Sequence, residues 1–277
     1  ISFATQEFTA TQTTIDIEFD WAFQQYSGSY LKAVLYNEAG QSVQTLINIT
    51  STGSGTYSGS VDVIANQKYS VDFRYYGTWD YGAKVDNILI TQMAAGYELA
   101  TIGTGTANTS LIPSYGYYDY SWSGMIYTQS EINKSGTLKT LSFYVDASSP
   151  SSSTLTNQKI YVGHTTSSSF PSSPDEVLTS EISVTDYTLV YDGSVTFTPG
   201  WTTVTLQQSF DYNNVNNLFL KMENRDGSYI NPYPIFDYTS STNRGAYKYA
   251  DGSYPNGSGT QTSIRPNVRF VFQSTGN

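Results

Sequence analysis

Short runs in which apolar and polar residues alternate recur along the sequence, and they restrict its fold more than any other feature. The clearest run covers residues 15–21, where three acids separate the apolar residues Ile15, Ile17, Phe19 and Trp21. Successive side chains of a β-strand point to opposite faces, so this run predicts a strand with one buried and one solvated face. Helical spacing is almost absent, and Gly, Asn, Asp, Ser or Pro ends most runs. The sequence therefore predicts an all-β protein.

The order of these runs predicts two tandem β-sandwich domains of the jelly-roll or immunoglobulin-like type. Further strands before residue 92 are expected at residues 30–36, 59–64, 68–75 and 84–91, with turns at 37–40 and 51–55. The pattern breaks into small residues at 93–96, and strands resume at residues 97–102. We therefore predict a jelly-roll-like sandwich over residues 1–94 and a larger β-sandwich over residues 95–277.

The second series of runs combines strands with long polar loops. Strands are expected at residues 137–145, 158–162, 188–191, 201–206, 217–222 and 268–272, and surface loops at residues 148–156, 167–174 and 251–262. Thr128 followed three residues later by Glu131 matches a capping box. This pair predicts a single helical turn.

Charge and composition exclude several classes of function. The 13 Lys and Arg residues against 23 Asp and Glu residues give a net charge of -10, which repels phosphate backbones and anionic lipid headgroups. No stretch approaches the ~20 continuous apolar residues of a membrane-spanning helix. With no Cys and a single His, the chain cannot form disulfides, cysteine-ligated zinc or imidazole clusters. We therefore expect no nucleic-acid partner, no membrane insertion and no cofactor, with a structural calcium ion as the exception considered below.

The same composition favours an extracellular or cell-surface location. The chain is rich in Ser, Thr, Gly, Asn and Tyr and poor in Lys and Glu, and it does not use Cys. The first ten residues lack a basic n-region followed by an apolar h-region. We therefore expect a mature fragment whose signal peptide has been removed or lies upstream in a longer precursor.

Three groups of aromatic residues are candidate ligand-binding surfaces, because flat rings stack on the C–H faces of sugars while phenol hydroxyls bind their OH groups. The first group is Tyr115, Tyr117, Tyr118, Tyr120 and Trp122. The second group is Tyr229, Tyr233, Tyr238, Tyr247, Tyr249 and Tyr254, interleaved with Arg244. The third group is Trp79 and Tyr81, beside Tyr75 and Tyr76. The alternative for each ring is that it fills a sandwich core or covers a sheet edge.

Polar residues supply weaker candidates. Asp86 and Asn87 are candidate calcium ligands, because hard cations take six to eight oxygen ligands from carboxylates, amides and carbonyls. The acids of residues 16–20, two apart on one strand face, could flank a glycosidic bond. Their alternative role is a solvated face paired across strands with Lys32 or Arg74. The single histidine, His164, is expected to be structural.

Residues 81–90, with the sequence YGAKVDNILI, resemble the closing strand of jelly-roll modules in bacterial surface proteins and carbohydrate-binding modules. Val85, Ile88 and Ile90 cannot all face one side under strict alternation, which predicts a β-bulge or a strand start at Asp86 and Asn87.

The second segment carries the stronger resemblance, through a series of short motifs in a fixed order. These motifs lie at residues 102–106, 117–118, 129–132, 161–166, 193–197, 217–218, 239–244 and 265–268. Together, over most of residues 97–272, they are similar to a β-sandwich module repeated in very large secreted proteins of Bacteroidota-type bacteria, often exported by the type IX route and attached to the cell surface. The resemblance implies a noncatalytic extracellular module of an adhesin-like protein, and it supplies no ligand.

We predict a noncatalytic adhesion or glycan-binding module of a larger cell-surface or secreted protein, with a polysaccharide or cell-surface glycan as its partner. The alternative is a structural subunit or spacer of an extracellular filament or surface layer, with a homo-oligomer or filament neighbours as partners and residues 1–14 donating an edge strand. A glycoside hydrolase or lyase is the third hypothesis. It lacks a recognisable nucleophile, metal or elbow motif.

Overall fold

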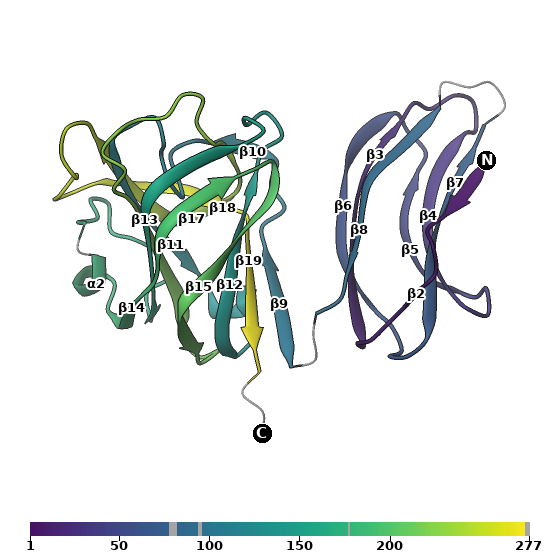
Figure 1. The fold of residues 1–277 in the computed structure, drawn as a ribbon, viewed down its shortest axis with the longest axis horizontal. Helices are drawn as coiled ribbons and strands as arrows, with labels where there is room; N and C mark the ends of the chain where they lie inside the picture. Colours follow the sequence, from purple (N-terminus) through teal and green to yellow (C-terminus); the bar gives the residue numbers. More distant parts are fainter. Residues whose placement is uncertain (78–81, 94–95, 177, 275–277) are drawn as a thin grey trace. The chain divides into compact units, whose positions relative to one another are not determined.

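The computed structural model describes residues 1–77, 82–93, 96–176 and 178–274, and most of them lie in antiparallel β-strands (Figure 1). The predicted all-β sandwich class is confirmed. Two helices of four residues each, α1 (Gln129–Ile132) and α2 (Leu178–Glu181), are the helical elements of this part of the chain. The chain divides into two compact units, residues 1–95 and residues 96–277, which are described separately.

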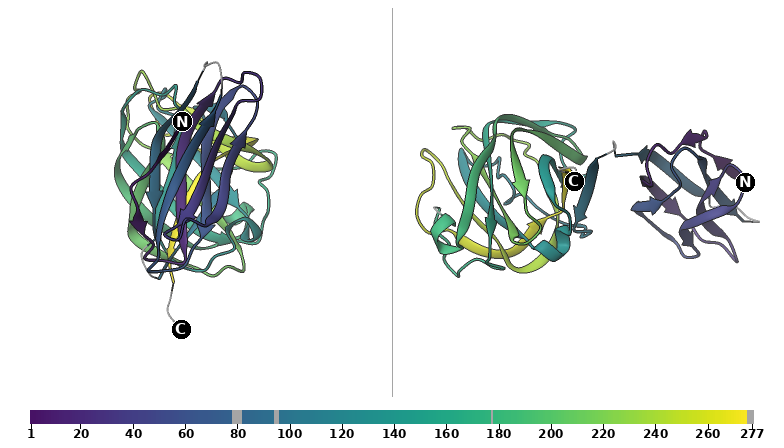
Figure 2. Two further views of the ribbon diagram at one scale, coloured as in Figure 1. Left: turned by 90° about the vertical axis from the view of Figure 1, so that its right-hand side faces the viewer. Right: turned by 90° about the horizontal axis from the view of Figure 1, so that it is seen from below.

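Residues 1–95 form a sandwich of two sheets. One sheet contains β1 (Ser2–Ala4), β2 (Phe8–Thr9), β7 (Lys68–Tyr76), β4 (Tyr30–Asn37) and β5 (Ser42–Ile49). The other contains β6 (Gly53–Asp62), β3 (Thr14–Phe23) and β8 (Ala83–Thr91) in that order. Figure 1 shows the two layers edge-on, and Figure 2 shows them from below.

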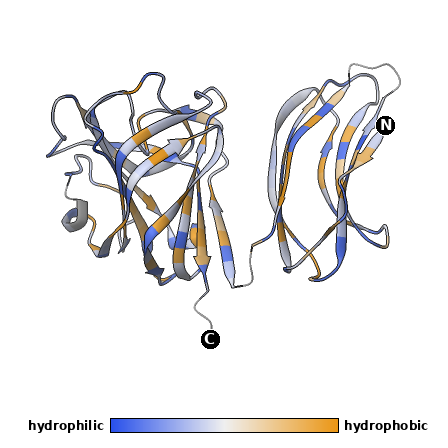
Figure 3. Ribbon diagram, in the orientation of Figure 1, coloured by the Kyte–Doolittle hydropathy of each residue, from blue (hydrophilic) through white to orange (hydrophobic). Residues whose placement is uncertain are grey.

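The alternation in β3 produces the buried face of this sandwich. Ile15, Ile17 and Phe19 are at most 1% exposed and pack against residues of the facing sheet, including Phe73, whose ring meets that of Phe19 edge-on at 5.0 Å. Fully burying such a side chain contributes about 1.5–3 kcal/mol, so these positions fix which face of β3 points inward. Figure 3 shows the resulting bands of hydrophobic and hydrophilic residues along the strands.

The predicted irregularity in β8 is a β-bulge. The register between β3 and β8 shifts between Glu18 and Asp20, and Asn87 has a positive φ of 52°. The extra residue turns Val85 and Ile90 toward the core while Ile88 remains 37% exposed. The bulge expected from the sequence is therefore confirmed.

Three expectations for this unit are wrong. β5 was not expected, because its residues do not alternate strictly. β6 begins at Gly53, inside the expected turn at residues 51–55. Gly53 and Gly55 lie under the indole of Trp21, where a Cβ on Gly55 would come within 3.3 Å of the ring. β1 and β2 were not among the expected strands. They pair with β7 and lie at the edge of its sheet, so the N-terminal segment still presents an edge strand.

Residues 96–277 form one continuous, strongly curled sheet. Its main order is β14 (Val184–Phe197), β13 (Ser153–Thr165), β16 (Asn217–Asn224), β11 (Tyr120–Tyr127), β17 (Phe236–Ala250), β12 (Gly136–Val145), β19 (Val268–Gln273) and β9 (Tyr97–Ile102). β15 (Gly200–Tyr212) pairs with β12, while β10 (Ala107–Thr109) and β18 (Thr260–Pro266) pair with β17. β12 and β17 meet through a single residue pair, Val145 and Phe236.

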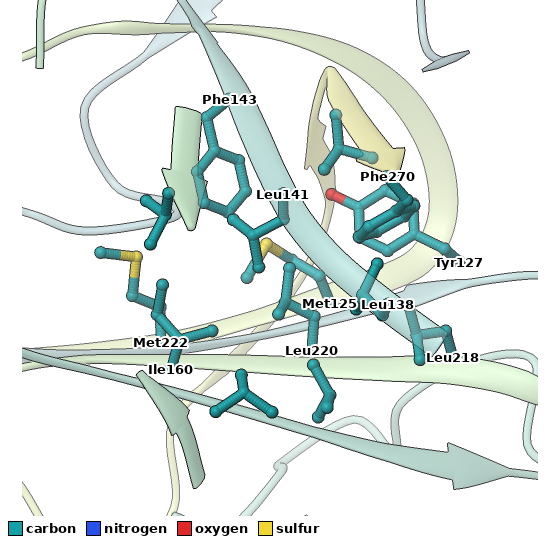
Figure 4. Packing of buried hydrophobic residues seen from close by; sticks show 14 of the residues in the cluster. Met125, Tyr127, Leu138, Leu141, Phe143, Ile160, Leu218, Leu220, Met222 and Phe270 are labelled. Carbon is teal, nitrogen blue, oxygen red and sulfur yellow. The ribbon is translucent and has the colours of Figure 1, made fainter. Parts of the chain in front are cut away.

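The curl folds the sheet over one apolar core (Figure 4). Met125, Ile160 and Leu220 come from the side of the sheet that contains β11, β13 and β16, and Leu141 and Phe270 come from the side that contains β12 and β19. Each of these five residues is fully buried. The two sides therefore face each other across a closely packed interior.

The expected strands of this unit are present; β9 has the expected bounds and the others are longer. β10, β11, β17 and β18 were not expected, and β18 begins at Thr260, inside the loop expected at residues 251–262. The loop expected at residues 148–156 is shortened because β13 begins at Ser153. The predicted helical turn is confirmed as α1, whose capping box joins Thr128 and Glu131. The backbone N–H of Thr128 donates to the Glu131 carboxylate at 2.9 Å.

Glu131 is also the acceptor of a buried ion-pair network. Arg265, 3% exposed, donates to both carboxylate oxygens at 2.8 and 2.7 Å, and Arg244 donates at 3.2 Å. Burial acts to raise the pKa of Glu131, but the bonds from Arg265 and Thr128 outweigh it and lower the pKa to about 2. The ionised carboxylate therefore stabilises the folded state at neutral pH.

We expect Glu131→Gln to lower the free energy of unfolding by about 1.5–3 kcal/mol at pH 7, because charge-assisted bonds are replaced by neutral ones. A group with a lowered folded pKa contributes fully above its unfolded value and loses that contribution as the pH falls toward about 2. Urea denaturation at pH 7 and pH 3 should therefore show a smaller difference between wild type and variant at pH 3. The exposed Glu38→Gln serves as the charge control, and equal stability of wild type and E131Q at pH 7 would contradict the prediction.

Candidate functional site

Seven tyrosine rings from three separate segments meet on the surface of residues 96–277. They are Tyr115, Tyr117, Tyr118, Tyr229, Tyr233, Tyr247 and Tyr249, here called the tyrosine cluster. Tyr229, Tyr117 and Tyr249 are 62%, 47% and 37% exposed, and the other four are half-buried. The cluster therefore presents aromatic surface to solvent and anchors it on partly buried rings.

Tyr115 lies at the centre of the cluster. Its ring centroid is 5.2 Å from that of Tyr118, 5.1 Å from Tyr249, 6.0 Å from Tyr233 and 6.2 Å from Tyr117. Rings at these separations attract each other by about 0.5–1.5 kcal/mol beyond their buried area. The segment that carries Tyr117 and Tyr118 is thereby tied to the segments that carry Tyr233 and Tyr249.

β17 supplies one edge of the cluster through its two-residue period. Tyr247 and Tyr249 project from the same strand face and stack at 6.1 Å with an interplanar angle of 8°. Tyr249 also lies 4.2 Å from the ring of Tyr118, the shortest centroid separation in the cluster. The strand therefore aligns two parallel rings and joins them to the loop beside it.

A buried polar network holds the loop that carries Tyr115 and Tyr118. The side-chain amide of Asn224, a fully buried residue, donates to the carbonyls of Tyr115 and Tyr118 at 3.4 and 3.3 Å. Its oxygen accepts from Gln158 at 2.7 Å, and Gln158 in turn accepts from the hydroxyl of Ser114 at 2.7 Å. Buried polar groups that satisfy one another rigidify their surroundings.

Close packing joins this loop to the loop that carries Tyr229 and Tyr233. The N–H of Ile230 donates to the carbonyl of Gly116 at 2.8 Å. A Cβ on Gly116 would lie 3.1 Å from the side chains of Ile230 and Leu155, so the close approach depends on glycine. The two loops therefore form one supported surface.

Partial burial raises the pKa of three hydroxyls in the cluster, those of Tyr115, Tyr118 and Tyr247. Burial raises the pKa of Tyr115, and burial, followed by the neighbouring Tyr249 and Asp251, raises the pKa of Tyr118. Asp119 and Asp251 border the cluster and are linked by a 3.4 Å bond from the N–H of Asp119. The site therefore offers stacking faces, phenol hydroxyls and a mildly acidic rim.

The structure brings together five of the predicted binding residues: Tyr115, Tyr117, Tyr118, Tyr233 and Tyr247. Three others lie elsewhere. Tyr120 packs edge-on against Tyr254 at 6.5 Å, and Arg244 is engaged by Glu131. Trp122 is 1% exposed. The predicted residues Trp79 and Tyr81 lie outside the residues that the structure describes.

Trp122 is a core residue, so its prediction as a surface ring is corrected. It packs with Ile126, Phe170 and Phe219 on the outer face of the sheet, in a second small core. Gly259 comes so close that a Cβ on it would lie 2.6 Å from the indole. Phe170, Ile182 and Tyr254 cover this face, which alternation alone would leave exposed.

The calcium candidates Asp86 and Asn87 are engaged with other groups. Lys84 lies 3.4 Å from Asp86, and the side-chain amide of Asn87 donates to Asp20 at 2.7 Å. Asn87 therefore turns its donor, and not its oxygen, toward the nearest carboxylate. Within the described ranges, no group of three or more His, Cys, Asp or Glu side chains is placed to hold a metal ion.

The acids of β3 form a solvated polar face. Asp16 accepts from the hydroxyl of Ser60, and Asp20 accepts from that of Thr56 at 2.5 Å. The alternative of a solvated face paired across strands is therefore correct, but the acids pair with Ser60 and Thr56 instead of Lys32 or Arg74. Arg74 lies in the other sheet and binds Asp72 at 2.7 Å.

Lys221 lies between two carboxylates, an arrangement that resembles a catalytic acid pair. Its Nζ lies 2.9 Å from carboxylate oxygens of both Glu176 and Glu223, and Arg225 binds the second oxygen of Glu223 at 2.6 Å. Burial acts to raise the pKa of Glu223, but the bonds from Arg225 and Lys221 hold it below its usual value. An ionised carboxylate held by cations on both oxygens is poorly suited to general-acid chemistry.

Two further features, His164 and an apolar cavity in residues 1–95, are interpreted as structural. His164 accepts from the N–H of Asn213 at 3.3 Å through Nε2 and contacts Asp186 at 2.9 Å through Nδ1, so neighbouring groups occupy both ring nitrogens. In residues 1–95, an apolar cavity of about 340 Å³ is lined by residues including Phe3, Leu31 and Phe73. Its lining offers few of the polar groups that a sugar requires.

No family model matches the chain, and no curated protein matches it. No helix in the described part of the chain is both long and apolar enough to cross a membrane.

We expect Asn224→Ala to destabilise residues 96–277 by about 1–3 kcal/mol and to loosen the loop at residues 113–119, because Gln158 and two loop carbonyls lose their partner. Thermal unfolding and hydrogen exchange of the loop amides measure the two effects. The exposed Asn231→Ala is the matched control. Unchanged exchange in the 113–119 loop of N224A would contradict the role assigned to this network.

Proposed function

We propose that the chain is a noncatalytic, glycan-binding module that acts through the tyrosine cluster. The observation that carries the proposal is the convergence of seven tyrosines from three segments onto one supported, partly exposed surface. Exposed aromatic patches of this kind usually mark binding sites, whereas single exposed rings need no explanation.

The chemistry of the cluster suits a neutral polysaccharide. Exposed rings such as Tyr117 and Tyr229 offer flat faces for the C–H faces of sugars, and their phenol hydroxyls offer hydrogen bonds. Asp119 and Asp251 at the rim would repel sulfate or phosphate groups. A ligand with many hydroxyls and no charge therefore matches both the stacking surface and its border.

The supported loops favour binding without rearrangement. Asn224 and Ile230 hold the loop of residues 113–119 through backbone carbonyls, so a ligand would not have to order it. A preorganised surface loses less free energy to ordering on association. An open stacking surface is nevertheless shallow, so we expect modest affinity per site.

An extracellular or cell-surface location and an adhesion role form part of this proposal. The absence of Cys, the low content of charged residues and the similarity of the motifs in residues 97–272 to a repeated surface module support it. The filament alternative keeps its edge strand, since β1 ends the order β1-β7-β4-β5 of its sheet and pairs with β7 alone.

We expect the protein to bind at least one neutral polysaccharide on a glycan array, and we expect Tyr117→Ala and Tyr229→Ala each to weaken that binding about 2- to 12-fold. This range corresponds to about 0.5–1.5 kcal/mol per lost ring contact. Affinity electrophoresis in gels containing the polysaccharide measures the change.

Tyr117→Phe should retain most of the binding because it keeps the stacking face. Tyr76→Ala, a change at a 55% exposed tyrosine outside the cluster, should bind as the wild type does. Absence of binding to every neutral glycan, or full binding by the Tyr117→Ala/Tyr229→Ala double variant, would refute the proposal.

A further inference from the structure

Two aspartates meet where β12 and β17 join. Asp237 follows Phe236 on β17, and Asp146 follows Val145 on β12, so the single residue pair between these strands places both acids at the junction. Asn108 of β10 lies directly opposite Asp237 in the sheet register. Three strands therefore bring two carboxylates and one amide to one point.

The Asp146 carboxylate is held in place. Its Oδ1 accepts from the N–H of Ser148 at 2.8 Å and from the Ser148 hydroxyl. The carboxyl group also makes hydrogen-bonding contacts with the side chains of Asn108 and Asp237. In addition, the N–H of Asp146 donates to the carbonyl of Ile235 at 2.9 Å.

One carboxylate oxygen of Asp237 lacks a hydrogen-bond partner. The residue is 7% exposed, and its Oδ1 is buried without any hydrogen-bond donor. The salt bridges of the described residues include no Lys, Arg or His bound to Asp146 or Asp237.

Two carboxylates in contact, one of them buried, are stabilised either by a shared proton or by a cation that binds both. We propose that residues 96–277 bind a calcium ion at this junction, with Asp146, Asp237 and Asn108 as its protein ligands. Asn108 is exposed and Asp146 is half-buried, so water can complete the shell from the open side. The amide of Asn108 presents oxygen to the ion by turning over.

The donor set selects calcium among common metals. All three ligands are oxygen donors, which hard cations prefer, and neither His nor Cys is present to favour zinc. Magnesium requires near-ideal octahedral geometry and gives up its water reluctantly, whereas calcium accepts irregular ligand sets. With only two charged ligands, we expect a dissociation constant of about 0.1–1 mM.

The ion would act as a clamp on the larger unit. It would connect β10, β12 and β17 at the place where β12 and β17 share only one residue pair. The adjoining loop is already tied to Ile235, since the hydroxyl of Ser149 bonds both its carbonyl and its N–H at 3.0 and 2.9 Å. The proposal is independent of glycan binding.

The test uses the full chain after removal of metals with a chelator. Calcium chloride is added up to about 10 mM while thermal unfolding and the heat of binding are recorded. We expect one saturable site and a rise in Tm of roughly 3–10 °C at about 10 mM calcium, which is about ten to a hundred times the dissociation constant. Magnesium chloride at the same concentrations should give a smaller rise.

Asp237→Asn distinguishes a loss of calcium binding from a loss of folding stability, because an amide has the same shape as the carboxylate and can donate to Asp146. We expect this variant to be at least as stable as the metal-free wild type and to lose its calcium response, with at least tenfold weaker binding. Asp86→Asn, at the calcium candidate in residues 1–95, should respond as the wild type does.

Three results would overturn the proposal. The first is an unchanged Tm and no binding heat in the wild type, which would mean that a shared proton neutralises the pair. The second is a normal calcium response in D237N, or its loss in D86N. The third is a magnesium response equal to that of calcium.

Discussion

The backbone pairings of β17 hold the larger unit together. This one strand pairs with β10, β11, β12 and β18 along its length, so it joins the two sides of the curled sheet. Its ends serve different purposes. Phe236 and Asp237 form the junction with β12, whereas Tyr247 and Tyr249 carry the edge of the tyrosine cluster. The proposed calcium site and the proposed binding surface thus depend on the same pairings.

The strands could be predicted from the sequence where one face of the strand is exposed to solvent, because apolar and polar residues then alternate. β3 alternates strictly because its acids face solvent, and even the bulge in β8 followed from the conflict among Val85, Ile88 and Ile90. β11 was missed for the opposite reason. Both of its faces are buried, since loops cover the outer face, and a strand buried on both sides loses the polar half of its pattern.

The candidate site was predictable in its residue types but not in its assembly. Tyr115, Tyr117 and Tyr118 are close in sequence and could be grouped directly, whereas their contacts with Tyr233 and Tyr249 arise from the tertiary pairing of distant segments. The amides that support them, Asn224 and Gln158, gave no signal because buried amides look like loop residues in a polar sequence. The sequence also did not show that the face of β11 with Trp122 is buried, because the loops that cover this face come from distant parts of the chain.

The tyrosine cluster balances support against exposure. Rings that pack on one another gain rigidity but lose stacking area, so Tyr115 is well placed to hold its neighbours and poorly placed to contact a ligand. Tyr117 and Tyr229 have the reverse balance, with about half or more of each residue exposed. Because inner rings and the buried Asn224 fix the outer rings, contact with a ligand would reduce little remaining freedom. The free energy of binding would then come from a few outer rings, whereas the inner rings would contribute through the stability of the fold.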